Sequence, residues 1–330
     1  MIRFGVIGTN WITEEFLKGA NENAHFTLTA VYSRKEETAK DFADKHGAKY
    51  IFTNLQDFVS SKEFDAVYIA SPNSFHADQA ILLMQNGKHV LCEKPFASNT
   101  REVTNMIKTA KQHNVLLMEA MKTTFLPNFK SIQENIHKIG KIRRYVANYC
   151  QYSSRYDSFK NGTILNAFNP SFSNGSLMDI GVYCVYPMVV LFGKPQSIQA
   201  NGFLLSSGVD GQGSILANYG DFEGVINHSK ITHSYLPSEI QGENGSIILD
   251  RISRTSKVEI RYHDGKVEDI STNTPQHPMY YEVAHFIELI QQNKLESPVN
   301  SYDRSLETIN ILEQARKQIG LIFPADHTKK

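Results

Sequence analysis

The sequence predicts an α/β protein with a doubly wound parallel sheet in its N-terminal part, followed by a strand-rich region with an antiparallel sheet that is open on one face. Strand-like and helix-like patterns alternate over residues 2–120, as expected for parallel strands joined by covering helices. Over residues 197–270, strand-like patterns follow one another with only turns between them, which is typical of antiparallel sheets. The chain has 330 residues, 41% hydrophobic and 21% charged, which is enough for two domains of ordinary size.

The N-terminal part begins with a short apolar strand at residues 2–7, which ends at Gly8. A helix is expected at residues 12–21, because apolar residues recur there at helical spacing. Gly47 and Gly87 each follow a helical pattern, as a C-terminal cap does. The remaining elements are strands at residues 26–32, 66–70, 90–92 and 115–119, and helices at residues 35–46, 74–86 and 100–113.

The pattern changes after about residue 120. Turn dipeptides such as Asp210-Gly211 and Asp264-Gly265 separate the later strands. The expected elements are a helix at residues 125–137, a strand at 143–152, several strands within 197–270, and closing helices at 278–292 and 303–319, with a frayed tail at 328–330. The predicted domains are therefore residues 1–120 and 121–330, with the closing helices able to pack back on the first domain.

The composition argues against several kinds of partner. The formal net charge is zero, which gives no electrostatic reason to expect nucleic acid or an anionic membrane. The N-terminus lacks a signal-peptide pattern, and no apolar run reaches ~18 residues. The cysteines, Cys92, Cys150 and Cys184, are too few and too widely spaced for a disulfide framework, and the twelve histidines form no ligand-like cluster. We expect a soluble cytoplasmic protein without a metal site.

The first strand-to-helix turn has features of a dinucleotide site. The segment Gly8-Thr9-Asn10-Trp11-Ile12-Thr13 stands where such folds place Gly-x-Gly-x-x-Gly. Only Gly8 is kept. Asn10 is the residue best able to replace glycine at positive φ, and Thr13 replaces the third, close-packing glycine. An ordinary turn in an unrelated α/β domain is the alternative.

The end of the second strand indicates which dinucleotide is bound. Ser33 and Arg34 stand where NAD-preferring enzymes carry an acidic residue for the ribose hydroxyls. A guanidinium can bind a 2′-phosphate, so this segment favours NADP over NAD. The alternative is a solvated helix start, because Lys35, Glu36 and Glu37 continue as surface charge.

Two further strand ends carry polar residues. Ser71-Pro72-Asn73 follows the strand at residues 66–70, where the pyrophosphate and nicotinamide ribose are expected. Asn73 could instead cap the next helix, and His76 is most simply a structural histidine. Glu93-Lys94-Pro95 follows the strand at residues 90–92, where a lysine is placed for chemistry. Alternatively, Lys94 pairs with Glu93, and Pro95 makes a special turn with a cis bond.

These motifs give the chain a resemblance to the Gfo/Idh/MocA oxidoreductases over nearly its whole length. The resemblance rests on the Gly8 turn, Ala70-Ser71-Pro72-Asn73 with His76, Glu93-Lys94-Pro95, Glu119-Ala120 with Phe125-Leu126-Pro127, and the run from Asn174 to Asp179-Ile180-Gly181-Val182-Tyr183. Tyrosine at 183, where many members have histidine, looks like the branch of dimeric dihydrodiol dehydrogenases and NADP-dependent xylose dehydrogenases.

The resemblance implies an N-terminal Rossmann domain and a C-terminal α+β domain with a large, open, mostly antiparallel sheet, whose face forms the dimer interface in many members. It implies an NAD(P)-dependent oxidoreductase that transfers hydride between nicotinamide and a secondary alcohol or lactol carbon of a sugar, polyol or cyclic diol. The expected partners are that small molecule and a second copy of the chain, with a tetramer as the alternative to a dimer. A nucleotide-binding regulator that lost turnover is the alternative function, but the presence of Lys94 and Tyr183 favours an enzyme.

The resemblance also implies roles for individual residues. Lys94 points at the oxygen of the reacting carbon, and Tyr183 donates or accepts the alcohol proton. A phenol is a weak acid near neutral pH, so this role needs a nearby ammonium. Asp179 lies four residues before Tyr183, on the same face of a helix, and could orient the substrate or the tyrosine. The alternatives are a core tyrosine and a helix-capping aspartate. The expected cofactor-binding residues are Gly8, Thr9, Asn10, Trp11, Ile12, Ser33, Arg34, Ser71, Pro72, Asn73, His76, Glu93 and Lys94.

Two loops are candidates for the substrate pocket. Arg155, Phe168 and Asn169 lie in polar loops before the Asp179 motif, and loops often carry binding residues. After Glu119-Ala120, many relatives show a Trp-x-Arg-Phe segment that borders the substrate. This chain reads Met121-Lys122-Thr123-Thr124-Phe125, which leaves Lys122 as the candidate there.

Overall fold

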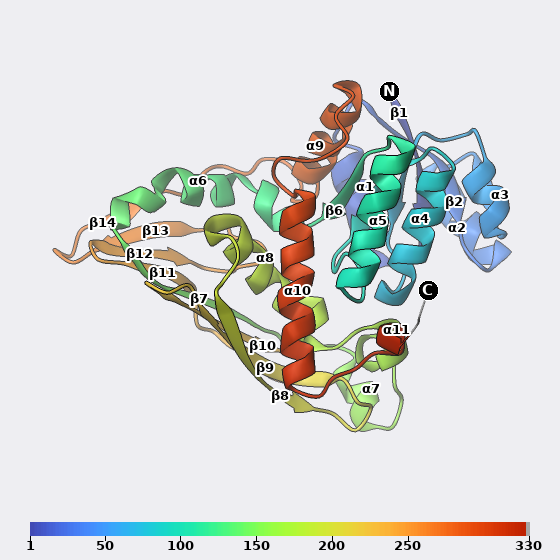
Figure 1. Cartoon of the computed structure of the whole chain (residues 1–330). Helices are drawn as coiled ribbons and strands as arrows, with labels where there is room; N and C mark the ends of the chain where they lie inside the picture. Colours follow the sequence, from blue (N-terminus) through green and yellow to red (C-terminus); the bar gives the residue numbers. More distant parts are fainter. Residues whose placement is uncertain (328–330) are drawn as a thin grey trace. The chain divides into compact units, whose positions relative to one another are not determined.

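The structure, a computed structural model, describes residues 1–327 and divides into two compact units (Figure 1). The first unit comprises Met1–Lys122 and Pro275–Ser305, and the second comprises Thr123–Thr274 and the described residues from Leu306 onward. The predicted frayed tail at residues 328–330 lies outside the described residues.

The first unit contains a six-stranded parallel sheet with the strand order β3-β2-β1-β4-β5-β6. This is the doubly wound order, in which the direction of winding reverses beside β1. It confirms the predicted parallel sheet. The strands are β1 (Ile2–Ile7), β2 (Phe26–Tyr32), β3 (Tyr50–Phe52), β4 (Ala66–Ile69), β5 (His89–Glu93) and β6 (Leu117–Ala120).

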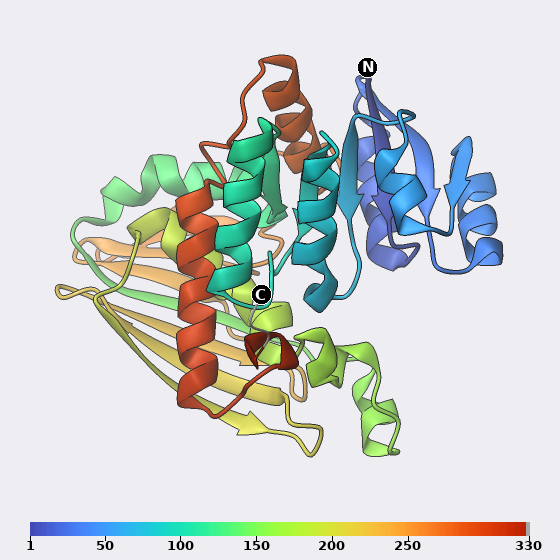
Figure 2. The same cartoon turned by 45° about the vertical axis from the view of Figure 1, so that its right-hand side comes forward.

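Helices cover both faces of this sheet, because right-handed crossovers on the two sides of β1 place them on opposite faces. On one face α4 and α5 lie side by side, and on the other α1 packs with α9 (Figures 1 and 2). Phe4 of β1 contacts Phe16 of α1 and Phe286 of α9, with ring centroids 6.3 and 6.0 Å away. The helices are α1 (Trp11–Ala20), α2 (Glu36–His46), α3 (Leu55–Ser60), α4 (His76–Gln85), α5 (Thr100–His113) and α9 (Tyr280–Gln291), with a 3-10 turn η1 (Asn73–Phe75) before α4.

The second unit contains an eight-stranded sheet in the order β14-β13-β12-β11-β7-β10-β9-β8. Every neighbouring pair is antiparallel except β7 and β10, which run parallel. The predicted mostly antiparallel sheet is therefore confirmed. The strands are β7 (Ile142–Cys150), β8 (Ser197–Leu204), β9 (Asp210–Asn218), β10 (Glu223–Ser229), β11 (Ser238–Gly242), β12 (Gly245–Leu249), β13 (Val258–Tyr262) and β14 (Val267–Asp269).

One face of this sheet is buried and the other is only half covered, as expected for alternating strand residues. Tyr145 and Ile226 on the inner face are fully buried, and the Tyr145 hydroxyl donates to the Cys184 carbonyl of α8 at 2.9 Å. The outer-face residues Val146 and Val225 are half-buried. Inner-face cover comes from α8 (Val182–Phe192), α6 (Pro127–Asn135) and α10 (Tyr302–Gln318).

Several short elements complete the second unit. The helix expected at residues 125–137 is α6 flanked by 3-10 turns η2 (Lys122–Phe125) and η3 (Ile136–Ile139). The short helices α7 (Tyr156–Lys160) and α11 (Pro324–His327) fall in segments with no predicted helix. Among the described residues, one segment, Pro170–Phe192, has the length and composition of a membrane span, but 83% of its apolar window is buried inside the protein, as in a core helix.

Candidate active site

The turn after β1 depends on Gly8. Its φ is +101°, and a Cβ at this position would lie 2.7 Å from the Ala70 carbonyl oxygen. Glycine is therefore required where the end of β1 approaches the end of β4. This is the position predicted for the dinucleotide turn.

Asn10 and Thr13 stabilise the turn by side-chain hydrogen bonds. The expectation that Asn10 has positive φ is wrong: its φ is −99°, and it is the N-cap of α1. Its side-chain oxygen accepts from the backbone N–H groups of Ile12 and Thr13, and its amide donates to Ala70 at 2.7 Å. The Thr13 hydroxyl donates to the Gly8 carbonyl at 2.9 Å. The turn thus forms without its second and third glycines.

A cavity of about 470 Å³ lies at this turn, at the edge of the sheet where the winding reverses. A volume of this size is typical of a small-molecule site. Its lining comes mainly from the carboxyl ends of β1, β2 and β4: Ile7, Gly8, Thr9, Asn10, Tyr32, Ser33, Arg34, Ala70, Ser71, Pro72, Phe75 and Gln79. The structure therefore brings together seven of the predicted cofactor residues.

Phe75 and Gln79 line the cavity but were missed in the sequence. They lie four residues apart at the start of α4, so they share one helix face. The Ser71 hydroxyl donates to the Gln79 side-chain oxygen at 2.7 Å, which links the end of β4 to this helix. By contrast, Trp11 is 63% exposed on α1, and neither Trp11 nor Ile12 belongs to the lining.

The end of β2 gives the cavity a cationic side. Arg34 is exposed and makes no ion pair within residues 1–327. No carboxylate is present among the twelve lining residues. Glu36 and Glu37 instead lie in the first turn of α2, where the helix dipole favours them.

The Glu-Lys-Pro loop follows β5, and its Lys94–Pro95 peptide bond is cis, which is the special turn considered as an alternative for Pro95. The buried Glu93 carboxylate accepts from the Tyr68 hydroxyl at 2.5 Å and from the Lys94 backbone N–H at 3.1 Å. Burial raises the pKa of Glu93, while Lys94 and Tyr68 oppose that shift. Glu93 thus fixes the backbone from which the half-buried Lys94 side chain extends.

Glu119 and His76 hold the same loop from two other sides. Glu119 accepts from the Phe96 backbone N–H at 3.0 Å, and burial raises its pKa to about 8. The ring nitrogens of His76 lie 3.0 Å from the Pro95 carbonyl and 2.9 Å from the Ser71 carbonyl. Burial lowers the pKa of His76, and a neutral ring donates only one of these bonds. His76 therefore joins the Glu-Lys-Pro loop to the cavity edge.

Asn73 and Lys122 lie close to these groups in the first unit. The backbone carbonyl of Asn73 accepts from the His76 N–H that begins α4. Lys122 follows β6, whose residue Ala120 pairs with Glu93 of β5, and its charge lowers the pKa of Glu93. Lys122 and Lys94 therefore both act electrostatically on the same buried carboxylate.

In the second unit, Asp179 lies in a π-helical turn, Leu177–Gly181, and Tyr183 follows it at the start of α8. Such wide turns often occur at functional sites. The Leu177 N–H at the start of the turn donates to Asp210 at 2.7 Å, so the capping role considered for Asp179 belongs to Asp210. Tyr183 is 8% exposed, and its ring lies 5.7 Å from that of Tyr149.

Two glycines of the 174–183 motif have a steric explanation. A Cβ on Gly175 would lie 2.2 Å from a carboxylate oxygen of Asp210, and one on Gly181 would lie 3.2 Å from the His228 ring. His228 also contacts the Ser176 hydroxyl at 2.9 Å through Nδ1. The motif is therefore shaped by two buried residues that come later in the chain.

Lys230 was missed in the sequence. It directly follows β10, and its ammonium donates to Asp179 Oδ2 at 2.6 Å. The signal in the sequence was two polar residues at alternate positions, His228 and Lys230, at the end of a strand-like run. The structure buries both. A buried lysine requires a partner, but the sequence does not identify it.

The predicted substrate residues lie in different environments. Arg155 is exposed at the start of α7. Asn169 accepts from the Ser171 N–H at 2.9 Å and caps a 3-10 turn, Pro170–Phe172. Phe168 is fully buried in a small cluster with Leu205 and Val209.

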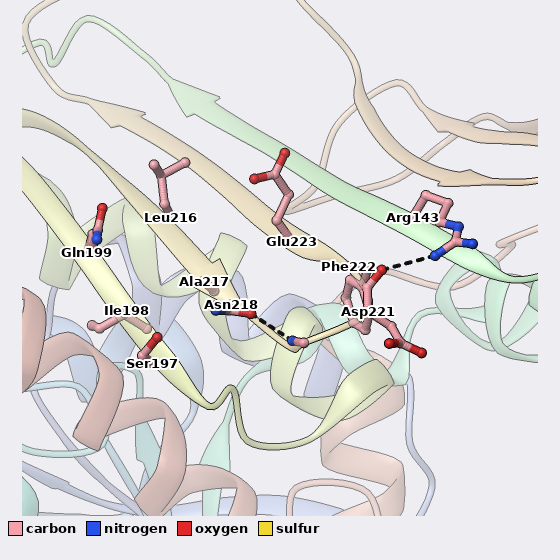
Figure 3. Close-up of a pocket in the computed structure, with 11 residues that line it drawn as sticks. Arg143, Ser197, Ile198, Gln199, Leu216, Ala217, Asn218, Asp221, Phe222 and Glu223 are labelled. Carbon is pink, nitrogen blue, oxygen red and sulfur yellow. Dashed lines mark hydrogen bonds between the residues drawn. The ribbon is translucent and has the colours of Figure 1, made fainter.

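A second hollow, of about 480 Å³, lies on the sheet of the second unit over β8, β9 and β10. Figure 3 shows Gln199, Leu216 and Glu223 on the same side of the sheet there. None of the predicted site residues lines it. It belongs to the half-covered outer face.

Comparison with known proteins identifies the family. The family model described as "Oxidoreductase family, NAD-binding Rossmann fold" matches residues 2–121, and that of the GFO/IDH/MocA C-terminal domain matches residues 133–248. The chain is 60% identical over 326 residues to scyllo-inositol 2-dehydrogenase (NADP(+)) IolU of Bacillus subtilis, with 99% of each chain covered. It is 29% identical to trans-1,2-dihydrobenzene-1,2-diol dehydrogenase of Xenopus laevis, with 98% of this chain and 99% of that one covered.

The fold is shared with solved structures. KijD10, a 3-ketoreductase from Actinomadura kijaniata solved with NADP, matches with a TM-score of 0.80 and 22% identity, over 96% of this chain and 97% of that chain. The matches confirm the predicted fold class and enzyme class, an oxidoreductase with an NAD-binding Rossmann domain. The chain belongs to the Gfo/Idh/MocA family of oxidoreductases.

Proposed function

We propose that this protein is an NADP-dependent dehydrogenase that oxidises a secondary hydroxyl of a cyclic polyol, with scyllo-inositol as the first substrate to test. The observation that carries the cofactor choice is the cavity side formed by Ser33 and Arg34, without a carboxylate in the lining. The 60% identity to a scyllo-inositol 2-dehydrogenase (NADP(+)) over 99% of the chain supports the substrate class.

The residues of the cavity fit a dinucleotide. The Gly8 turn leaves space that a Cβ would fill, and it leads directly into the N-terminus of α1, where pyrophosphate groups bind. Arg34 offers a guanidinium for a 2′-phosphate, and Ser33 offers a hydroxyl. When bound, the nicotinamide supplies the hydride exchange.

The protein's own side chains handle the oxygen and its proton. Lys94 stabilises the negative charge that develops on the substrate oxygen, and its backbone is fixed by Glu93. Tyr183 accepts the hydroxyl proton during oxidation and returns it during reduction. Asp179 orients a substrate hydroxyl by accepting its hydrogen bond. Arg155, Asn169 and Lys122 are further donors for a polyol, and Phe168 supports the segment of Asn169 by packing.

We also propose that the protein is a homodimer formed through the outer face of its second sheet. A register row on this face places Leu216, Val225 and Val146 side by side on β9, β10 and β7, and the row continues through Glu239 of β11 to Ile248 of β12. Leu216 is 46% exposed, and the others are half-buried. Apolar side chains gathered on one half-covered face are typical of an interaction surface.

A reducing, cytoplasmic environment suits the thiols. Cys92, Cys150 and Cys184 are all free, and two of them are buried. The balanced net charge gives no reason to expect nucleic acid or a membrane as a partner.

The test is a steady-state assay of the purified protein with NADP⁺ or NAD⁺, following absorbance of the reduced nicotinamide. The substrates are scyllo-inositol, myo-inositol, D-xylose and a trans-dihydrodiol. We expect the highest kcat/KM with NADP⁺ and scyllo-inositol. Activity on the aldose or diol only would contradict the polyol substrate, and equal use of both cofactors would contradict the role of Arg34.

A further inference from the structure

We infer that Lys230 is a positioning residue for the dehydrogenase reaction, acting through Asp179. This inference rests on the proposed role of Asp179. Lys230 lies outside the 174–183 motif, 51 positions from Asp179 in the chain.

The Lys230 side chain is 4% exposed, whereas that of Asp179 is 35% exposed. The ammonium donates to Asp179 Oδ2 at 2.6 Å and to the Ala167 carbonyl at 3.3 Å, and it lies 5.1 Å from the Phe168 ring centre. A group enclosed in this way cannot contact a substrate, but it can orient the more accessible carboxylate. Lys230 therefore positions and does not itself react.

The backbone of Lys230 is fixed on both sides. Its N–H donates to the Gly211 carbonyl at 2.9 Å, and its carbonyl accepts from the Ser153 N–H at 2.8 Å. These bonds tie Lys230 to β9 on one side and to the segment after β7 on the other. The ammonium is thus held by the sheet, and not by a flexible loop.

Two side-chain contacts join the end of β10 to the turn that carries Asp179. His228 and Lys230 are two positions apart, so both point to the same face of the strand. Ser176 and Asp179 are three positions apart, so both lie on one face of the helical turn. His228 contacts Ser176 at 2.9 Å, and Lys230 contacts Asp179 at 2.6 Å. Together, the two contacts fix the position of the turn along the strand and its rotation about its own axis.

Lys230 also compensates charge that the fold places nearby. Asp210 is fully buried at the start of the π-turn, and the ammonium of Lys230 lowers its pKa against the larger effect of burial. One ammonium therefore stabilises the two carboxylates that begin and occupy the turn. The bond to Ala167 joins the same ammonium to the loop that precedes Asn169.

A double-mutant cycle tests this inference. We expect Lys230→Met to lower kcat about 10²-fold with a much smaller change in KM, because misplacement of a reacting constellation acts mainly on turnover. Asp179→Asn should cause a loss of similar size. If Lys230 acts through Asp179, the double variant loses no more kcat than the worse single variant. A double variant whose loss of kcat is the product of the two single losses would overturn the inference. So would a wild-type kcat in Lys230→Met.

Hydrogen exchange separates this inference from the proposed function. Lys230→Met should increase amide exchange in residues 166–168 and 177–181, without changing NADPH affinity. Lys138→Met is the matched control, because Lys138 pairs with Glu268 at 2.5 Å in the same unit; its kcat and its exchange in both segments should equal those of the wild type. Unchanged exchange in Lys230→Met overturns the inference even if the wild type oxidises polyols. Wild-type kcat in Asp179→Asn would contradict the proposed role of Asp179.

Discussion

Asp210 binds the backbone N–H of Leu177 at 2.7 Å, across 33 positions of the chain, and so caps the turn that carries Asp179. Its other carboxylate oxygen lies 2.2 Å from where a Cβ on Gly175 would stand, and Gly175 has a φ of +135°. The capping contact and the glycine therefore depend on each other. A side chain at position 175 would displace the cap.

We predict that Gly175→Ala destabilises the protein by about 3 kcal/mol or more and lowers kcat, since it combines positive-φ strain with a steric clash. Gly208→Ala is the matched control, because Gly208 has a φ of +90° and no atom within 4 Å of a Cβ. It should cost about 1–2 kcal/mol through φ alone. Chemical denaturation and steady-state kinetics measure both effects. Equal losses in the two variants would show that the Asp210 contact is unimportant.

Arg34→Ala should weaken NADPH binding about 10-fold to 100-fold and leave NADH binding nearly unchanged. The reason is that hydrogen bonds to a charged group contribute about 1.5–3 kcal/mol, and only NADPH carries the 2′-phosphate. Fluorescence titration with each nucleotide measures this difference. Lys35→Ala is the control, since Lys35 does not line the cavity and should show a much smaller effect. Parallel losses for both nucleotides in Arg34→Ala would refute the phosphate-binding role.

Substitutions of the two lysines at opposite ends of β5 should have opposite effects on turnover and on stability. Lys94→Met is expected to abolish measurable turnover while thermal stability and NADPH affinity stay close to those of the wild type. Lys88 is buried and donates to the carbonyls of Ser61 and Phe64 at 2.6 and 2.9 Å. Lys88→Met should therefore keep kcat and lose about 1–3 kcal/mol of stability. Normal kcat in Lys94→Met would remove the proposed catalytic role.

Glu119 should make stability fall as pH rises. Its pKa is raised from 4.5 to about 8 in the folded protein, so folding favours the protonated carboxyl. Its contribution is complete below about pH 4.5 and is lost between there and about pH 8, at up to about 1.4 kcal/mol per pH unit. Glu119→Gln keeps an acceptor for the Phe96 N–H and removes the charge.

The stability of Glu119→Gln relative to the wild type should therefore increase with pH over that window and become constant above it. Urea denaturation at about pH 5 and about pH 8 provides the comparison. Other titrating groups are common to both proteins and cancel in the difference. Parallel pH curves would mean that Glu119 does not titrate in this range.

The parallel sheet and its cofactor edge could be predicted because their signals are local. Apolar runs ended by Gly8, by Ser71 and by Glu93-Lys94 mark successive strand ends, and parallel strands bring those ends to one edge. Hence Ser33, Arg34 and Ser71 were expected at the cavity that they line. The short β3 and α3 were missed because three and six residues are too few for a periodic pattern.

The contacts that support the site were not predictable in the same way. The position of Asn10 suggested a glycine substitute, but the backbone took an extended φ because its side chain could cap α1. The pair Lys230–Asp179 depends on the parallel pairing of β10 with β7 in an otherwise antiparallel sheet. Strand order of this kind follows from long-range packing, which no local pattern specifies.

The proposed dimer gives the last prediction. Val225 lies between Leu216 and Val146 in register on the central strands of the outer face, so Val225→Arg would place a charge in the middle of the apolar row. Because an unpaired charge in a dry interface is unfavourable, we expect this variant to sediment as a monomer at concentrations where the wild type is a dimer. Val267 is on the same face by register but on the edge strand β14, far along the sheet from the central row, and it is 57% exposed, so Val267→Arg should leave the dimer intact. A wild-type monomer in analytical ultracentrifugation would refute the dimer. A dimeric Val225→Arg would instead locate the interface away from this face, because an interface that covers the central row would bury the introduced charge.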